Sequence, residues 1–398
     1  MTERLYYTDP DCLEFEATIV GITHEEGRTL VYLDRTAFYP TSGGQPFDTG
    51  RLNETRVVDV IDQEHRVAHV IDAARTLEDG ERVTGRIDHE RRRDHMQQHT
   101  GQHILSASFV RLQDVPTLSF HLGSSTSTID LAREVSRSAI EAAEEAANGV
   151  IWENRPVNIR FVSGDEGEAL PLRKPPQRAG TLRLIDIADW DLSACGGTHA
   201  TRTGEIGAIV IREWERYKNG TRITFVCGQR ALRSHRELRD VVSHASELLS
   251  VASADVDTAV ERLVAEARDL RKVTRTLSQE LSTVRAAALA ERAEPVAGVD
   301  LLVAVLEGAD ASALRTAAAS LTATSGRVVV LLTEARPAAI VVARSADATG
   351  VDASRLLGQL ADRFGGRGGG KRELAQGGGV DADRDAVARE VRRFLDAK

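Results

Sequence analysis

Two pairs of metal-binding residue types, each with the same spacing, are the chemical centre of this sequence. His99 and His103 lie four residues apart in the string QHTGQHIL, and Cys195 and His199 lie four apart in CGGTH. Residues at i and i+4 share one face of a helix, so the first pair presents two imidazoles together. Three imidazoles and one thiolate match the donors and coordination number of a tetrahedral zinc ion. The pattern therefore predicts one Zn2+ per chain.

Each pair taken alone has an ordinary structural explanation. A lone helical HxxxH pair is more often a surface or core feature, and His95 offers a competing pair with His99. The long separation of the two pairs argues against a local zinc finger and favours a site built across a fold. Four protein ligands also suit a purely structural zinc, whereas a catalytic zinc keeps a position open for water or substrate. On the residues alone, a structural zinc site and a catalytic zinc site both stay open.

The composition is that of a folded protein in a reducing compartment. The chain has 398 residues, 41% of them hydrophobic and 28% charged, and this length allows roughly two to four domains. Its net charge of −9 excludes a global basic field, so a polyanion has to bind local basic patches. The three cysteines make no disulfide framework. The N-terminus lacks the apolar core of a signal peptide, and no apolar run approaches about 20 residues, so we expect a cytoplasmic protein without a membrane span.

Periodicity and turn residues predict an α+β multidomain protein in four parts. Residues 1–90 contain short β-branched runs that predict a small β-barrel, interrupted by the glycine-rich string TAFYPTSGGQPFDTG at 36–50. Residues 91–230 alternate helices with strands, and we expect one α+β domain that holds the zinc ligands. Residues 231–294 are predicted to form a helical coiled-coil arm. Residues 295–398 have a βα pattern that predicts a compact α/β domain.

The helical arm carries the alternating four-three spacing of a coiled-coil seam. No glycine or proline interrupts the chain from residue 229 to about residue 292. A helical hairpin, a dimerising arm and a long helix packed on its own chain all fit this pattern. The seam positions are Val256, Val260, Leu263, Ala267, Leu270, Thr274, Leu277, Leu281 and Val284.

The glycine-rich segment 36–50 contains too many glycines and prolines for a regular element. Gly43 and Gly44 allow positive φ or a close approach of the backbone to another surface. An ordinary hairpin loop also fits this composition.

Two basic clusters are predicted to bind phosphate. Three consecutive arginines begin the helix of the first histidine pair, where the positive end of the helix dipole disfavours them. The second cluster lies in GGRGGGKRELAQGGG at 365–379, where glycines expose the backbone. This segment fits a flexible linker or a phosphate-backbone contact, and it lacks the residue order of a P-loop. The candidate cations are Arg91, Arg92, Arg93, Arg367, Lys371 and Arg372.

At these strings the chain resembles a known family. QHTGQHIL and CGGTHATRTGEIG are similar to the two zinc motifs in the editing domain of alanyl-tRNA synthetase and of free-standing AlaX-type editing proteins. TAFYPTSGGQPFDTG resembles the glycine-rich segment of the barrel that precedes this domain, and the string at 365–379 resembles the C-terminal domain of the synthetase. The resemblance covers nearly the whole chain without the aminoacylation half, so it is to the long form of AlaX.

The resemblance implies a trans-editing hydrolase that needs no ATP and acts on tRNA(Ala) mischarged with serine or glycine. A pocket built to hydrogen-bond a hydroxyl discriminates well against the analogue without one, and Gln45 and Thr36 are the candidates for that contact. The resemblance further implies tRNA binding and homodimer formation through the C-terminal region. It also implies that His95 is not a zinc ligand. A threonyl-tRNA editing domain and a tRNA-binding scaffold with structural zinc are the alternatives. The implied zinc ligands are His99, His103, Cys195 and His199.

Overall fold

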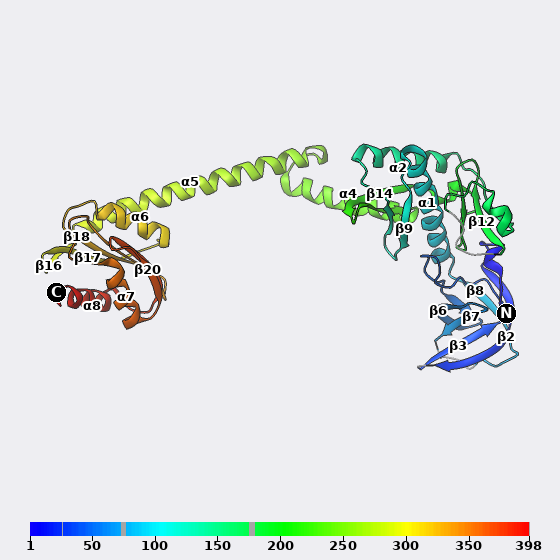
Figure 1. Ribbon diagram of the computed structural model, residues 1–398, viewed down its shortest axis with the longest axis horizontal. Helices are drawn as coiled ribbons and strands as arrows, with labels where there is room; N and C mark the ends of the chain where they lie inside the picture. The colour runs from blue at the N-terminus through cyan, green and yellow to red at the C-terminus, as the bar shows by residue number, and fades with distance from the viewer. Residues whose placement is uncertain (26, 73–76, 175–179, 398) are drawn as a thin grey trace. The chain divides into compact units, whose positions relative to one another are not determined.

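The computed structural model describes residues 1–25, 27–72, 77–174 and 180–397. The chain divides into two compact units, Met1–His244 and Ala245–Lys398, each with its own hydrophobic core (Figure 1). Helices and sheets occur in both units, which confirms the predicted α+β multidomain class. Within the described ranges, no helix is long and apolar enough to cross a membrane.

Unit 1 starts with strands that close into a barrel in the order β2-β3-β7-β6-β5-β8. Successive side chains of a strand point to opposite faces, so Phe15, Ala17 and Val83 enter a core shared with Phe38. The short strand β5 pairs with both β6 and β8 and so ties the end of the glycine-rich segment to the barrel. The elements are β1 (Glu3–Arg4), η1 (Leu5–Tyr7), β2 (Glu14–Glu25), β3 (Arg28–Leu33), β4 (Arg35–Thr36), β5 (Gly50–Leu52), β6 (Thr55–Gln63), β7 (Arg66–Ile71) and β8 (Arg82–Ile87).

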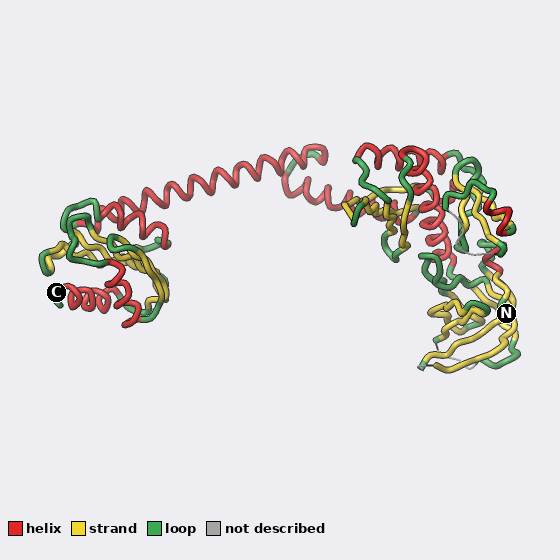
Figure 2. Tube along the Cα trace, viewed as in Figure 1, coloured by secondary structure: helices red, strands yellow, loops and turns green. Residues whose placement is uncertain are grey.

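A long central helix, α1 (His89–Gln113), organises the rest of unit 1. It ends at Asp114, which adopts the left-handed conformation with φ of 54°. Side chains at every position from 95 to 109 are buried, and Figure 2 shows the helix running among strands and other helices. Because many of these buried side chains are polar, each needs a hydrogen-bond partner from the surrounding elements.

Two antiparallel sheets and a second helix surround α1. One sheet has the order β14-β15-β10-β9, and the other has the order β11-β12-β13. In the second sheet Leu184 pairs with Ala194, which carries the chain from Asp191 to Cys195 alongside β12. The elements are β9 (Thr117–Leu122), β10 (Ser127–Leu131), α2 (Arg137–Trp152), β11 (Val157–Val162), α3 (Gly164–Glu168), β12 (Leu182–Ile187), β13 (Asp191–Ala194), η2 (Thr203–Ile206), β14 (Ile209–Tyr217) and β15 (Gly220–Cys227).

Two helices follow unit 1's last strand. Helix α4 (Gln229–Leu249) is separated by η3 (Ser253–Asp255) from the long helix α5 (Val256–Ala290). Within the predicted seam, Leu263 is 46% exposed and Leu270 is 66% exposed. The structure therefore shows a long helix with an uncovered apolar face, and the coiled coil stays a prediction.

The α/β domain of unit 2 contains a sheet in the order β16-β17-β18-β19-β21-β20. Its glycine-rich segment forms the antiparallel pair of β20 and β21, so the flexible-linker interpretation is wrong. A Cβ at Gly368 would lie 2.5 Å from Gln376 O, which explains why this tight pairing needs glycine. The elements are β16 (Glu294–Val296), β17 (Val299–Leu306), α6 (Ala311–Leu321), β18 (Arg327–Thr333), β19 (Ala338–Arg344), α7 (Ala353–Phe364), β20 (Arg367–Gly370), β21 (Leu374–Val380) and α8 (Arg384–Asp396).

Candidate metal centre

The structure brings the four predicted zinc ligands together in unit 1. The ligand atoms of His99, His103, Cys195 and His199 all lie within 4.8 Å of one another. Cys195 Sγ is 3.4 Å from His99 Nε2 and 3.3 Å from His199 Nε2. A tetrahedral zinc ion with bonds of about 2.0–2.3 Å separates its ligands by roughly 3.3–3.8 Å, so this donor set fits zinc. The three histidines are buried, and Cys195 is the only one of the four residues with intermediate exposure.

Each of the three imidazoles has its Nδ1 atom held by an acceptor from another side chain. The pairs are His99 with Gln45 Oε1 at 2.7 Å, His103 with Asp191 Oδ2 at 2.9 Å, and His199 with Thr100 Oγ1 at 3.2 Å. With these acceptors, each neutral ring carries its proton on Nδ1 and leaves the Nε2 lone pair free for the cluster. Such partners fix the tautomer and the orientation of imidazoles that bind metals.

The electrostatics of the cluster favour the thiolate form of Cys195 and the neutral form of His199. Burial opposes ionisation of the Cys195 thiol, but the imidazoles of His99 and His199 outweigh it and hold the pKa of Cys195 well below its ordinary value. Burial also lowers the pKa of His199 to about 3. Burial by itself lowers the pKa of His103, but the hydrogen bond to Asp191 reverses the direction and raises it. Metal ligation needs a thiolate and neutral imidazoles, and both the thiolate and neutral His199 are favoured before any metal arrives.

Asp191 and Arg173 form an ion pair that supports His103. Asp191 Oδ2 accepts from His103, and Asp191 Oδ1 accepts from Arg173 Nε at 2.7 Å. Burial tends to raise the pKa of Asp191, but His103 and Arg173 together hold it far below its usual value. Sequence reasoning missed both residues. A carboxylate four positions before Cys195 was a visible signal, but only the pairing of β12 with β13 shows that it reaches His103.

Gln45 reaches His99 because the glycine-rich segment turns tightly just before it. Ser42 and Gln45 exchange backbone hydrogen bonds, and Gly43 and Gly44 have φ values of 54° and 82°, which glycine adopts without penalty. Gln45 Oε1 accepts from His99 and from the Thr198 backbone, while Nε2 donates to Thr198 Oγ1. Both ends of this buried amide are occupied. Gln45 thus contacts a candidate metal ligand, and its predicted contact with a seryl hydroxyl stays a prediction.

Thr36, the second predicted substrate contact, is buried inside the barrel instead. Its Oγ1 lies 2.8 Å from His69 Nε2 and accepts from Phe38 N at 3.1 Å. His69 Nδ1 in turn donates to Val31 O at 3.0 Å. The hydroxyl is buried and contacts two barrel residues, so Thr36 belongs to the polar core of the barrel, and its role as a substrate contact stays a prediction.

The three consecutive arginines have three different environments. Arg92 is 1% exposed, and its guanidinium pairs with Asp48 and donates to Pro10 O and Ala37 O. The charge and the donors of Arg92 anchor the glycine-rich segment to α1, and its predicted contact with phosphate stays a prediction. Arg91 is half-buried and donates to Phe47 O. Arg93 is exposed, and its side chain pairs with no described residue.

The predicted cations of unit 2 lie on or between β20 and β21. Arg367 and Lys371 are exposed, and neither side chain makes an ion pair or hydrogen bond in the described part of the chain. Arg372 pairs with Asp352 at 3.1 Å on the surface. Exposed pairs of this kind contribute little, so Arg372 can exchange its partner for another anion.

His95, the competing histidine of α1, is not part of the ligand cluster. Burial lowers its pKa to about 3, so the ring is neutral. Its Nδ1 has no hydrogen-bond partner among the described residues, in contrast with the three clustered imidazoles.

Three family models match separate stretches of the chain. Residues 11–91 match the tRNA synthetases class II (A) model, residues 182–224 match the threonyl and alanyl tRNA synthetase second additional domain, and residues 298–397 match the DHHA1 domain. The second of these stretches contains Cys195 and His199, and the third contains the glycine-rich pair β20–β21.

Curated relatives match along nearly the whole chain. The alanine–tRNA ligase of Pyrococcus furiosus is 34% identical over 389 residues, covering 94% of this chain and 42% of the ligase. The ligase of Halobacterium salinarum is 37% identical over 417 residues, covering 100% of this chain and 44% of the ligase. The chain thus spans less than half the length of these relatives. Among solved structures, the C-Ala domain of Aquifex aeolicus alanyl-tRNA synthetase matches with 26% identity and a TM-score of 0.25, covering 26% of this chain and 96% of that one.

Along nearly its whole length the chain is similar to a part of these alanine–tRNA ligases. The stretches that match family models resemble the second additional domain of threonyl and alanyl tRNA synthetases and the DHHA1 domain.

Proposed function

We propose that the protein is a zinc-dependent trans-editing deacylase, which hydrolyses tRNA(Ala) mischarged with serine or glycine to free amino acid and tRNA. The observation that carries this proposal is the cluster of His99, His103, Cys195 and His199, in which every imidazole is oriented by its own hydrogen-bond partner. Alanine–tRNA ligases are the relatives along nearly the whole chain, which supports tRNA(Ala) as the partner.

The chain's residues have separable tasks in this proposal. A bound zinc ion would polarise or position the ester carbonyl that water attacks. His99, His103, Cys195 and His199 would hold the ion, and the exposed side at Cys195 is where a substrate has access. Asp191 keeps the proton of His103 on Nδ1, so that Nε2 stays available as a ligand atom.

Closed coordination favours a second candidate, a tRNA-binding scaffold with structural zinc. Four protein donors already satisfy a tetrahedral ion, which is typical of structural sites. The intermediate exposure of Cys195 favours the enzyme, because it places the cluster near the surface, where a substrate could approach.

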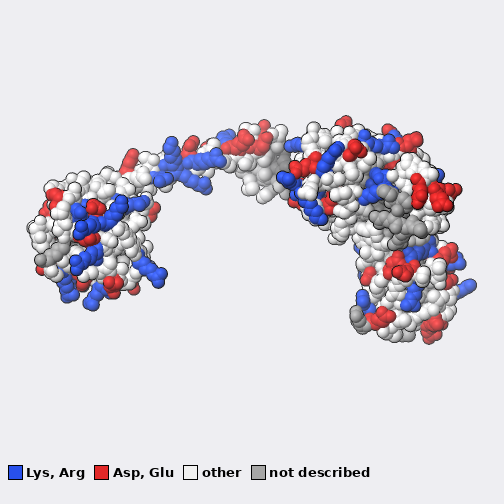
Figure 3. Space-filling view, viewed as in Figure 1, with Lys and Arg blue, Asp and Glu red and all other residues white. Residues whose placement is uncertain are grey.

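Binding of tRNA needs local cations because the chain as a whole is acidic. Figure 3 shows mixed charges on the visible face, with cations gathering along α5. On this helix Arg268, Arg271, Lys272 and Arg275 are exposed at i, i+3, i+4 and i+7, and so share one face. We propose that this face, together with Arg93, Arg367 and Lys371, binds the phosphate backbone. Self-association through the C-terminal region is a further proposal, supported by the uncovered seam of α5.

The decisive experiment compares hydrolysis of Ser-tRNA(Ala), Gly-tRNA(Ala), Ala-tRNA(Ala) and Thr-tRNA(Thr) by the zinc-loaded protein. We expect release of serine or glycine from tRNA(Ala), with cognate Ala-tRNA(Ala) spared. Preferred hydrolysis of Thr-tRNA(Thr) would reassign the substrate. Intact tRNA binding without hydrolysis of any of the four would favour the scaffold.

A further inference from the structure

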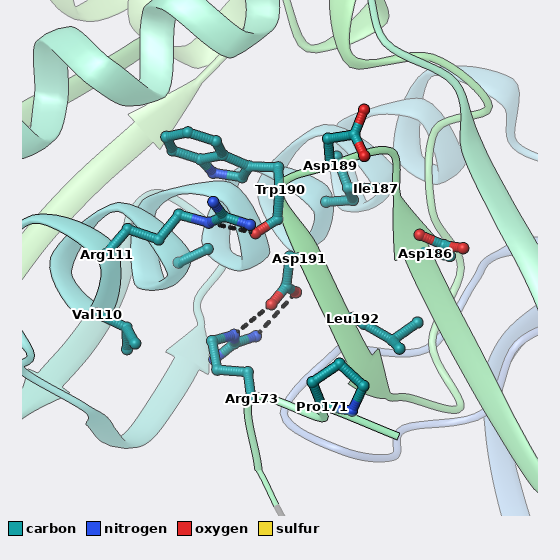
Figure 4. Close-up of a pocket in the computed structure, with 11 residues that line it drawn as sticks. Val110, Arg111, Pro171, Arg173, Asp186, Ile187, Asp189, Trp190, Asp191 and Leu192 are labelled. Atoms are coloured by element: carbon teal, nitrogen blue, oxygen red, sulfur yellow. Dashed lines mark hydrogen bonds and ion pairs between the residues drawn. The ribbon is translucent and has the colours of Figure 1, made fainter. Parts of the chain in front are cut away.

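Two arginines support the ligand cluster from different sides. Beside His103, Arg173 pairs with Asp191, and Figure 4 shows these two side chains joined by paired contacts. Beside Cys195, the support comes from Arg183, which extends from strand β12 and is 9% exposed. Asp191 orients an imidazole, whereas Arg183 contacts the backbone that carries the thiol.

Arg183 holds both backbone polar groups of Cys195. Cys195 N donates to Arg183 O at 3.1 Å, and Arg183 Nη1 donates to Cys195 O at 2.7 Å. The same Nη1 atom also donates to Gly197 O at 3.0 Å. The backbone of Cys195 is therefore fixed against β12, and rotation about the Cα–Cβ bond is the main freedom that the sulfur retains.

The turn 195–197, which Arg183 holds at both ends, contacts two members of the ligand cluster. Gly197 N lies 3.4 Å from Cys195 Sγ and donates to it. Gly197 also packs closely on His99, because a Cβ at this position would lie 2.2 Å from His99 Cε1. A shift of this turn would therefore move the sulfur and press on the His99 imidazole at the same time.

The donors of Arg183, and not an ion pair, explain its buried position. Among the residues that the structure describes, no carboxylate pairs with Arg183, and its Nη2 atom is buried without a hydrogen-bond partner. A buried cation without a counter-charge is costly. In return, the planar guanidinium reaches several carbonyl oxygens from one rigid fork, which the ammonium group of lysine cannot do.

The remaining contact of Arg183 joins the turn 195–197 to the start of the chain. Arg183 Nε donates at 2.8 Å to the backbone oxygen of Tyr7, the last residue of η1. The Arg183 guanidinium carbon also lies 5.6 Å from the centre of the Tyr7 ring. A Cβ at Gly196 would lie 3.8 Å from Tyr7 Oη, so the tyrosine lies beside the turn as well.

We propose that Arg183 is a positioning residue of the metal centre, which holds the turn 195–197 so that the Cys195 sulfur can share an ion with the three imidazoles. The inference rests on the proposed function, because it assumes that the four clustered residues bind zinc. Arg183 acts through the backbone of the turn, and its bond to Tyr7 O makes the place of the sulfur depend on η1.

The test uses Co2+ in place of zinc, because the thiolate-to-cobalt charge-transfer band reports the bond between sulfur and metal. Arg183→Lys keeps the positive charge and loses the planar fork. We expect it to lower the affinity for Co2+ by about tenfold and to weaken the charge-transfer band per bound ion. In the metal-free protein, amide hydrogen exchange over residues 195–199 should become about tenfold faster, since contacts of the turn are lost.

Arg155→Lys is the matched control. Arg155 also donates to a backbone carbonyl, that of Ala188 at 3.0 Å, directly after β12. None of its described contacts is to the turn 195–197. Urea unfolding should show a loss of stability in both variants, whereas only Arg183→Lys should change the Co2+ affinity, the charge-transfer band and the exchange of residues 195–199.

A purely structural role of Arg183 gives a different result. A folded Arg183→Lys protein with reduced stability but with the Co2+ affinity and charge-transfer band of the wild type would overturn the inference. Arg183→Gln is the second variant if the first does not fold. Loss of the fold in both variants would show that Arg183 maintains the fold as a whole, and would equally overturn its assignment as a positioning residue.

Failure of this inference and failure of the proposed function are distinguishable. The expected changes in Arg183→Lys, with Ser-tRNA(Ala) stable in the wild-type protein, would support the inference and remove the deacylase proposal. Hydrolysis of Ser-tRNA(Ala) with a wild-type Co2+ spectrum in Arg183→Lys would do the reverse. Serine release by a wild type that binds no Co2+ would remove the zinc site and the inference with it. If both proposals hold, Arg183→Lys lowers kcat for Ser-tRNA(Ala) by about tenfold and changes KM by less than about threefold.

Discussion

The carboxylate of Asp191 accepts a hydrogen bond from His103 Nδ1 at 2.9 Å and is itself held by Arg173 at 2.7 Å. These contacts fix the ring orientation of the buried His103 and keep its proton on Nδ1, so that Nε2 is ready to bind a metal ion. They join α1 to β13, and so link the two stretches of sequence that supply the ligands.

Asp191→Asn is expected to lower the affinity for zinc by about 10- to 100-fold, because the loss of a carboxylate partner weakens a metal-binding imidazole. Competition with a chelator measures the affinity. Asp186→Asn is the control, since Asp186 lies on the neighbouring strand and pairs with Arg160 near the surface. Equal zinc affinity of Asp191→Asn and the wild type would show that Asp191 does not support the site.

Gly197→Ala is expected to disrupt the cluster, because a Cβ there would lie 2.2 Å from His99 Cε1 and 2.9 Å from Gln45 Oε1. Gly196→Ala is its control, since the nearest atom to a Cβ at Gly196 is Tyr7 Oη at 3.8 Å. Zinc content after dialysis should fall in the first variant and stay near one per chain in the second. The same zinc content in both variants would contradict the packing described for His99.

Thr36→Val is expected to destabilise the protein by about 1–3 kcal/mol, because it leaves His69 Nε2 and Phe38 N without their partner in a buried site. Thr84→Val, which removes an exposed hydroxyl bond to Glu16, should change stability by less than about 0.5 kcal/mol. Urea unfolding measures both. A stable Thr36→Val protein with altered preference between serine and glycine would restore Thr36 as a substrate contact.

The buried contact between Thr36 and His69 also predicts that the stability of the protein depends on pH. Burial lowers the pKa of His69 to about 4 in the folded protein, from the ordinary value of 6.5. Between these values the unfolded chain binds more protons, so the stabilising effect is complete above pH 6.5 and is lost as the pH falls toward 4. The stability difference between wild type and His69→Gln should therefore shrink by about 3 kcal/mol from pH 7 to pH 4. Parallel pH curves for the two proteins would rule out this account.

The sequence was sufficient to select the four residues that the fold brings together and to find most regular elements, for identifiable reasons. The side-chain types of His99, His103, Cys195 and His199 suit few shared roles other than metal binding. Helix α1 is long enough for its helical periodicity to be recognised in the sequence. Short elements were missed: β5 and β13 have three and four residues, too few for a period. Yet β13 is the strand that carries Asp191.

Side-chain roles that depend on long-range packing could not be predicted. Arg92 belongs to a visible arginine run, but its burial depends on Asp48, a residue on another segment. The glycine-rich string drew attention to Gln45, but its contact with His99 depends on a turn at Gly43 and Gly44 that the sequence did not predict. The pairing of β20 with β21 likewise escaped prediction, because glycine runs are also typical of flexible linkers.

The measurement that tests the central claim most directly is the rate of serine release from Ser-tRNA(Ala), determined together with zinc content for the wild type and Cys195→Ala. The wild type should contain one zinc ion per chain and release serine. Folded Cys195→Ala should have lost zinc and release serine at least roughly 100-fold more slowly, because one of four ligands and the accessible sulfur are gone. A folded, zinc-free Cys195→Ala protein that releases serine at the wild-type rate would contradict the account.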